Sequence, residues 1–255
     1  MAKQFYMKKL TFILLICTLF VACRKKNLVL PASQTVSENG LVAYYPLDGH
    51  SKDLTLYANH GVTNAFYAPD RNGLASKASL FNNSFFQSNK IPINVSKQYT
   101  FSFWVKMQSY ADGMAIMELA KGEDTTRIPC NLNPQIWQYR DSMFLTTSSN
   151  INNQIYIMSL KNIKYQSISN WANVTWTVNN GLTKMYVDGV LTITRQMPWP
   201  DLEGMNLTLG NSGNSCPGDY GVSNYHNQPS NCYIDEVKIY NRVLSDDEVM
   251  KLAKQ

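Results

Sequence analysis

The carboxylates of this sequence lack the spacing that a polysaccharide hydrolase needs. Such enzymes hold two carboxyl groups so that both side chains converge on one bond. Glu118 and Glu123 are five positions apart with a glycine between them, and Asp235 and Glu236 are adjacent. Because strand side chains alternate between two faces, each pair would point to opposite faces of a sheet. No Glu-x-Asp-x-x-Glu pattern occurs. The carboxylates therefore argue against a hydrolase.

Aromatic residues outside the regular strand alternation are the candidates for ligand binding. The sugar C–H faces of a glycan pack on flat rings, and nearby amides and carboxylates bind its hydroxyls. The candidates lie on an irregular strand, between two prolines and in a long loop: Trp137, Tyr139, Trp199, Tyr220 and Tyr225. The alternative is that these rings are exposed aromatics that fix long loops.

Histidines and glycines give no sign of a zinc or phosphate site. His50, His60 and His226 have neither the spacing of zinc ligands nor an evident nucleophile as partner. Gly210–Asn214 is typical of a turn, because it lacks the lysine and the helix that follow a phosphate-binding loop.

The last thirty residues predict a closing strand and a short helix. Residues 233–240 are rich in β-formers, and a period of two puts Asp235 on one face with Tyr233, Val237 and Ile239. A carboxylate among core aliphatics needs a partner or a metal ion. Ser245 and Glu248 form a capping box, which predicts a helix whose apolar side packs back on the domain.

The middle of the chain predicts further strands. Short segments rich in β-formers are separated by turn residues, as at Asn179-Asn180-Gly181 and Asp188-Gly189. About a dozen such strands favour two packed antiparallel sheets. Further strands are expected at Met114–Leu119, Gln135–Tyr139, Met143–Thr147 and Ile155–Leu160.

Several blocks of the sequence resemble one family. Residues 233–249 are similar to the closing motif of laminin G-like, concanavalin A-type jelly-roll domains in Bacteroidetes-type lipoproteins. Residues 40–49, 79–83, 99–107 and 171–193 match further motifs of these domains. The resemblance implies an all-β, two-sheet antiparallel jelly-roll sandwich with a short C-terminal helix.

The resemblance also implies a structural calcium ion and core tryptophans. Related domains hold calcium near the first turn and the closing strand, and the matching positions are Asp48 and Asp235. The alternative is that Asp235 caps loop amides. Trp104, Trp171 and Trp176 match core positions of the family and are expected to be structural.

The N-terminus predicts export and lipidation. A basic segment, an apolar run over residues 10–21 and Ala22-Cys23 are typical of a bacterial lipoprotein signal. We expect a signal peptide over 1–22, lipidation at Cys23, a tether over 23–39 and the jelly-roll domain over 40–255. The alternative is an ordinary signal peptide with an accidental cysteine. Arg24-Lys25-Lys26 stands where surface-exported lipoproteins carry an acidic run, which favours the periplasmic side of the outer membrane over the cell surface.

Charge and cysteines are consistent with an exported binding protein. The net charge is +5, but six of the 23 basic residues precede residue 27, which leaves 17 basic and 18 acidic residues in the remaining chain. That balance gives no indication of nucleic-acid binding. We predict a disulfide between Cys216 and Cys232 in an oxidising envelope, while pairings with Cys130 stay open.

The sequence as a whole favours a non-catalytic module that binds a carbohydrate or a protein, in a cell-envelope lipoprotein. The expected partner is a glycan or an envelope protein, with the membrane reached through the lipid anchor. Two alternatives are a glycoside hydrolase or lyase of the same fold, and a structural or adhesive envelope component.

Overall fold

The computed structural model describes residues between 39 and 255, with gaps. The described residues are 39–91, 97–108, 114–121, 135–139, 142–149, 154–160, 170–197, 199, 202, 204–210 and 228–255. The chain divides into two compact units, Met1–Thr35 and Val36–Gln255, and every described residue belongs to the second. The predicted signal peptide, Cys23 and nearly all of the tether lie outside the described residues.

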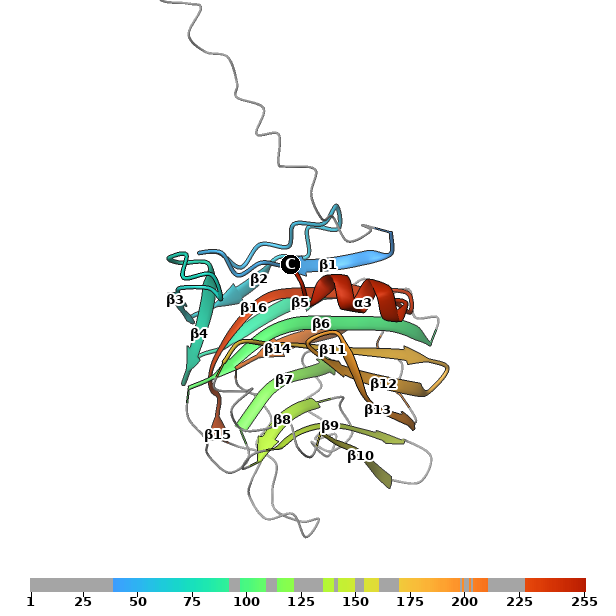
Figure 1. Ribbon diagram of the computed structural model, residues 1–255. Coiled ribbons are helices and arrows are strands. Elements are labelled where there is room, and N and C mark those ends of the chain that lie inside the picture. Colours follow the sequence, from blue (N-terminus) through green and yellow to red (C-terminus); the bar gives the residue numbers. More distant parts are fainter. Residues whose placement is uncertain are drawn as a thin grey trace, which may run out of the picture. The chain divides into compact units, whose positions relative to one another are not determined.

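Two sheets form the domain (Figure 1). Sheet A has the order β13 (Val190–Gln196), β12 (Leu182–Val187), β11 (Ala172–Asn179), β6 (Gln98–Met107), β16 (Asn231–Tyr240), β4 (Ala78–Asn82) and β3 (Phe66–Ala68). Strand β1 (Leu41–Tyr45) also pairs with β16. Sheet B has the order β10 (Gln154–Leu160), β9 (Ser142–Ser149), β8 (Gln135–Tyr139), β7 (Met114–Lys121), β14 (Met205–Leu209), β5 (Phe86–Lys90) and β2 (Gly61–Thr63).

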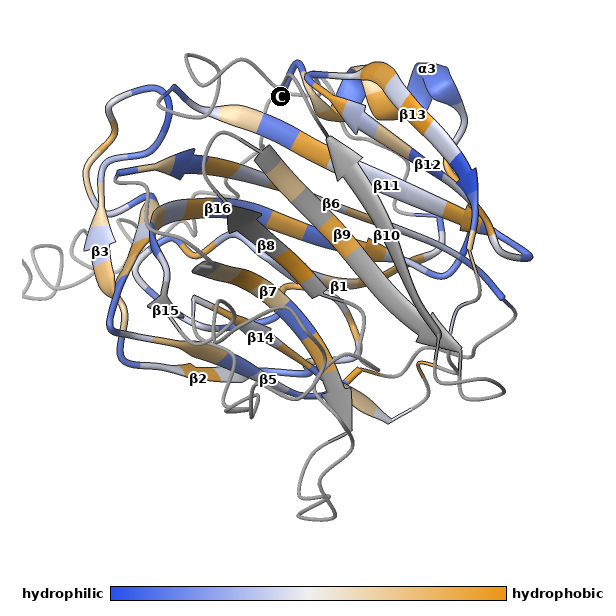
Figure 2. Ribbon diagram, turned by 90° about the horizontal axis from the view of Figure 1, so that it is seen from below, coloured by the Kyte–Doolittle hydropathy of each residue, from blue (hydrophilic) through white to orange (hydrophobic). Residues whose placement is uncertain are grey.

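The strand pairing confirms the predicted all-β sandwich. Among the strands that the structure describes, every pairing is antiparallel except that of the two-residue β15 (Gln228–Pro229), which runs parallel to β7. Apolar residues alternate with polar residues along the strands, as the hydropathy colouring shows (Figure 2). The apolar faces of the two sheets meet in one core that contains residues from both sheets.

Trp176 anchors the centre of that core. Its side chain is fully buried and stacks on Phe101 with the ring centroids 4.7 Å apart. Phe103 meets the same indole edge-on at 6.3 Å. The predicted structural role of Trp176 is therefore confirmed.

Strand β16 changes face in its middle because of a β-bulge. Glu236 has a φ of 54°, and the pairing with β6 shifts register between Asp235 and Lys238. An extra residue in one strand inverts the alternation that follows it. Ile234 and Val237 both point into the core, and Asp235 lies on the outer face of sheet A. The prediction that Asp235 shares a face with Val237 and Ile239 is therefore wrong.

The helix α3 (Asp246–Leu252) lies beside sheet A (Figure 1). Ser245 is the N-cap and forms the predicted capping box with Glu248. Val249 and Leu252 are buried in a small second cluster with Tyr186 of β12, Tyr240 of β16 and Leu244. Within the described part of the chain, no helix is both long and apolar enough to cross a bilayer.

Candidate functional site

The outer face of sheet A carries polar and aromatic side chains that lie close together. Strands β11, β6 and β16 lie side by side there, and their pairing sets outward-facing residues in rows. One row contains Asn173, Trp104 and Asp235, and the row beside it contains Lys106 and Tyr233. The strands therefore fix the order of these side chains across the face.

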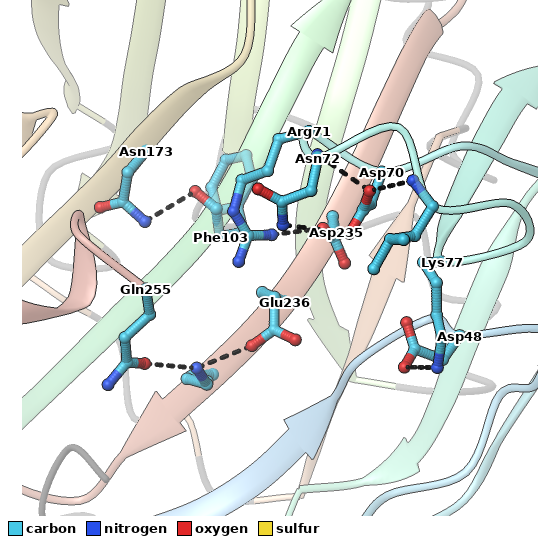
Figure 3. Close-up of polar contacts among 12 residues, drawn as sticks. Asp48, Asp70, Arg71, Asn72, Lys77, Phe103, Asn173, Asp235, Glu236 and Gln255 are labelled. Carbon is cyan, nitrogen blue, oxygen red and sulfur yellow. Dashed lines mark hydrogen bonds and ion pairs between the residues drawn. The ribbon is translucent and has the colours of Figure 1, made fainter. Parts of the chain in front are cut away.

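Asp235 is buried on this face and paired with an arginine (Figure 3). Arg71 Nη1 lies 2.6 Å from Asp235 Oδ2, and the guanidinium also stacks over the Trp104 ring, 4.8 Å from its centre. Asp235 Oδ1 is buried and has no hydrogen-bond partner among the described residues. Burial, helped by the nearby Glu236, raises the pKa of Asp235 to about 8 even though Arg71 lowers it.

A turn between β3 and β4 delivers Arg71 to this position. Asp70 Oδ1 accepts hydrogen bonds from the backbone N–H groups of Asn72 (2.9 Å) and Leu74 (2.8 Å). Gly73, with a φ of 79°, closes the turn by donating its N–H to the Asp70 carbonyl. Aspartate and glycine favour such a turn because the side chain caps the backbone and glycine tolerates a positive φ.

A second ion pair, between Lys238 and Glu236, lies on the outer face beyond the bulge. Lys238 Nζ lies 2.8 Å from Glu236 Oε2 and donates to Gln255 Oε1 at 3.1 Å (Figure 3). The Tyr44 hydroxyl lies 2.8 and 2.9 Å from the two oxygens of Glu236. Burial and the Glu236 carboxylate raise the pKa of Tyr44 above its usual range. Both acidic residues of the adjacent pair are thus engaged by protein cations.

The two residues predicted to hold calcium are bound to different cations. Asp48 Oδ2 lies 2.7 Å from Lys77 Nζ, while Asp235 pairs with Arg71. Calcium requires six to eight oxygen ligands. The described residues contain no group of three or more acidic, histidine or cysteine side chains that could hold a metal ion. The unpartnered Asp235 Oδ1 is one available oxygen, so these residues fit calcium poorly, and calcium binding stays a prediction.

Partly exposed aromatic rings form the neighbouring row. Trp171 and Tyr233 have ring centroids 6.1 Å apart at a tilt of 54°. Lys106 Nζ lies 5.5 Å from the centre of the Tyr233 ring, and Gln108 Nε2 donates to the Tyr233 hydroxyl at 3.1 Å. Together with Trp104 of the adjacent row, these rings form a group that we call the aromatic row: Trp104, Trp171 and Tyr233, all partly buried. Two flat rings beside hydrogen-bonding groups suit a sugar ring.

Trp199 is built into the sandwich. Its indole N–H donates to Thr183 Oγ1 at 2.7 Å, and its ring meets Tyr99 edge-on at 5.5 Å. The partly buried ring packs against the core, which leaves only part of it for a ligand. Its predicted role in ligand binding stays a prediction.

The other predicted aromatic residues are not brought to the aromatic row by the described structure. Trp137 and Tyr139 belong to β8 of sheet B, where Trp137 pairs with Ala115 and Phe144, and their side chains lie outside the described residues. Tyr220 and Tyr225 lie outside the described residues altogether. These four predictions therefore stay untested.

The predicted disulfide has only one cysteine in the described structure. Cys232 is fully buried in the core with a free thiol, and burial raises the pKa of that thiol to about 12. Cys216, its predicted partner, and Cys130 lie outside the described residues. The bridge stays a prediction, and it would require Cys216 to reach between the two sheets.

Sequence reasoning missed the aromatic row and Arg71. Trp104 and Trp171 were expected in the core, but each points away from it, since their neighbours Val105, Phe103 and Ala172 are buried. The signal that could have found them is the alternation itself, because Phe103 and Val105 leave Trp104 on the other face. The pairing of Arg71 with Asp235 joins residues 164 positions apart and has no local signal.

Comparisons with solved structures agree on the fold. Domain 4 of the extracellular arabinanase AbnA of Geobacillus stearothermophilus, in complex with arabinotriose, is 21% identical with a TM-score of 0.60, covering 84% of this chain and 98% of that one. The botulinum neurotoxin serotype D ligand-binding domain, in complex with N-acetylneuraminic acid, is 14% identical with a TM-score of 0.60, covering 84% and 50%.

A third similar structure is the binding domain of botulinum neurotoxin DC in complex with rat synaptotagmin II. It is 13% identical with a TM-score of 0.60, and the match covers 84% of this chain and 51% of that one. The chain thus spans about half the length of these toxin domains. No curated protein sequence matches. Residues 81–250, two thirds of the sequence, match the model of one family, and the chain belongs to this concanavalin A-like lectin/glucanases superfamily.

Proposed function

We propose that this chain is a non-catalytic carbohydrate-binding module that holds its ligand on the outer face of sheet A. The observation that carries the proposal is the aromatic row, in which the partly exposed rings of Trp171 and Tyr233 have centroids 6.1 Å apart on the two sides of strand β6. Rings on the outer face of a strand bury less apolar surface in the core than Trp176 does. Their flat faces can pack against the C–H faces of a sugar.

The surrounding contacts favour binding because they hold the row in place before a ligand arrives. Arg71 rests on the Trp104 ring and is fixed by Asp235, and Gln108 holds the Tyr233 hydroxyl. A site whose side chains are already ordered loses less conformational entropy on binding. These contacts support a rigid platform.

The state of the carboxylates favours binding over catalysis. A glycosidase needs one carboxyl group as acid and a second as nucleophile or base on either side of the bond. On the outer face of sheet A, Asp235 is bound by Arg71 at 2.6 Å and Glu236 by Lys238 at 2.8 Å. The alternative, a hydrolase or lyase, predicts release of reducing ends from β-glucans or uronate polymers by the purified protein.

Two of the similar structures are glycan complexes, one with arabinotriose and one with N-acetylneuraminic acid. At 21% and 14% identity, they support the fold and make a glycan a reasonable first ligand class to test.

A protein ligand is the second candidate. The synaptotagmin complex is one precedent on this fold. Large apolar side chains are exposed near the edge strands β2 and β3, with Val62 at 63%, Phe66 at 64% and Leu74 at 57% of full exposure. Exposed large apolar side chains contribute to protein interaction sites where they form a contiguous patch.

The test is calorimetric titration of the purified domain with a panel of oligosaccharides. We expect Trp171→Ala to weaken binding at least tenfold, which corresponds to about 1.4 kcal/mol. The matched control is Tyr57→Ala, which removes an exposed aromatic ring outside the aromatic row. If Trp137→Ala abolishes binding while Trp171→Ala does not, the ligand lies on sheet B and the assignment to sheet A is wrong.

We further propose that the domain belongs to a cell-envelope lipoprotein anchored through Cys23, on the outer membrane. This proposal rests on the lipobox-like Ala22-Cys23 after an apolar run. Cells fed an alkyne fatty acid should label the wild-type chain and not the Cys23→Ala variant. Labelling that survives in Cys23→Ala would contradict the anchor.

A further inference from the structure

Lys106 is the one cation on the described outer face of sheet A that makes no ion pair with a described residue. Arg71 is paired with Asp235 and Lys238 with Glu236 on the same face. The Asp188 carboxylate, at the edge of the next row, accepts the backbone N–H of Asn173 at 2.8 Å. Lys106 instead lies over the Tyr233 ring, with its ammonium 5.5 Å from the ring centre.

The two rings beside Lys106 lean toward each other across its strand. Tyr233 is on β16 and Trp171 immediately precedes β11, with β6 and Lys106 between them. Two strands apart corresponds to about 10 Å between backbones, since neighbouring strands are about 4.8 Å apart. The centroid distance of 6.1 Å therefore places the rings close above the strand that carries Lys106. Such rings cover the aliphatic part of a lysine and leave its ammonium at their edge.

Two of the polar groups at this point can donate hydrogen bonds to a ligand. The Lys106 ammonium has three N–H groups and no acceptor. The Tyr233 hydroxyl already accepts from Gln108 Nε2 at 3.1 Å, so its own proton is free to donate. A ligand group that contacts these donors must supply acceptor oxygens. A negative charge on that group strengthens each hydrogen bond and neutralises the charge of the Lys106 ammonium.

From this arrangement we infer that the site prefers an acidic sugar, one that carries a carboxylate or sulfate group. Its ring packs on Trp171 while the anionic group accepts from Lys106 and Tyr233. This inference rests on the proposed carbohydrate-binding function and names its ligand class. Lys106 is the residue that sets the preference, because its ammonium lies at the rings, whereas the Arg71 and Lys238 side chains are each held by a carboxyl group of the protein.

The experiment compares each charged ligand with a neutral form of the same oligosaccharide. Oligomers of galacturonate, mannuronate and glucuronate are titrated against their methyl esters, and sulfated oligosaccharides against their desulfated forms. We expect the charged form of at least one pair to bind tenfold or more tightly at low salt, with the preference falling as salt screens the ammonium. The pair that shows the preference identifies carboxylate or sulfate as the group.

Lys106→Met tests the residue, because methionine keeps the apolar stem and removes the charge. It should abolish the preference, so that the charged and neutral forms bind the variant with equal affinity. Lys90→Met is the control, since Lys90 is exposed on β5 of sheet B. Equal binding of charged and neutral forms by the wild type, or a preference unchanged in Lys106→Met, overturns this inference and leaves the carbohydrate-binding function standing. If no oligosaccharide binds at all, both proposals fail.

Discussion

Asp235→Asn should change how the stability of the domain depends on pH. The carboxyl group of Asp235 is buried, with one oxygen on Arg71 and the other without a described partner. Two effects oppose each other here, because burial disfavours the charged form and Arg71 favours it. The pKa of Asp235 rises from 3.8 to about 8, so the effect of burial exceeds that of Arg71.

The sign of the pH dependence follows from this direction. Between pH 5 and 8 the folded protein holds a proton on Asp235 that the unfolded chain has lost. Because the folded state binds more protons, wild-type stability falls as pH rises through this window. Each pKa unit corresponds to 1.36 kcal/mol, so the loss across the window is at most about 4 kcal/mol.

Urea denaturation of wild type and Asp235→Asn at pH 5, 6.5 and 8 measures this loss, because other titrating groups cancel in the difference. We expect the variant to gain at least about 1.4 kcal/mol on the wild type between pH 5 and 8, which is one pKa unit of the shift. Asp247→Asn, which removes an exposed carboxylate of α3, is the control and should show a constant difference. A constant difference for Asp235→Asn would mean that Arg71 keeps Asp235 charged, and would refute the reasoning.

Three further changes test the packing. Trp176→Ala should cost about 3–5 kcal/mol of unfolding free energy because it empties the centre of the core, and a loss below 1 kcal/mol in denaturant titration would contradict that position. Ser245→Ala should cost about 1 kcal/mol because the N-cap of α3 is lost, and an unchanged melting temperature would show that the cap is unimportant. Gly189→Ala should cost more than Gly73→Ala in the same titration. Both have φ near 78°, but an added Cβ at 189 would lie 2.8 Å from Met250 Cα and the one at 73 meets nothing, so equal losses would exclude that contact.

The structural features that depend on residues close in sequence could be predicted from the sequence. The strands, the hairpin turns and the capping box of Ser245 and Glu248 follow from alternation, turn residues and capping preferences, and the structure has them. Each signal lies within a few residues of the feature that it predicts. For that reason the sandwich and its C-terminal helix could be predicted from the sequence.

The site could not be predicted in the same way. The bulge at Asp235 and Glu236 inverts the faces of β16, and nothing in a run of β-formers indicates where an extra residue will be inserted. The Arg71 guanidinium reaches Asp235 only after three strands have paired. The resemblance to the family also assigned Trp104 and Trp171 to the core, although their neighbours' alternation already placed them outside.

A crystal structure of the domain with a bound oligosaccharide tests the central claim most directly. The account predicts that a sugar ring lies against Trp171 and Tyr233, with its polar groups toward Lys106. Electron density for the sugar over strands β8 and β9 of sheet B, with the aromatic row empty, would contradict it.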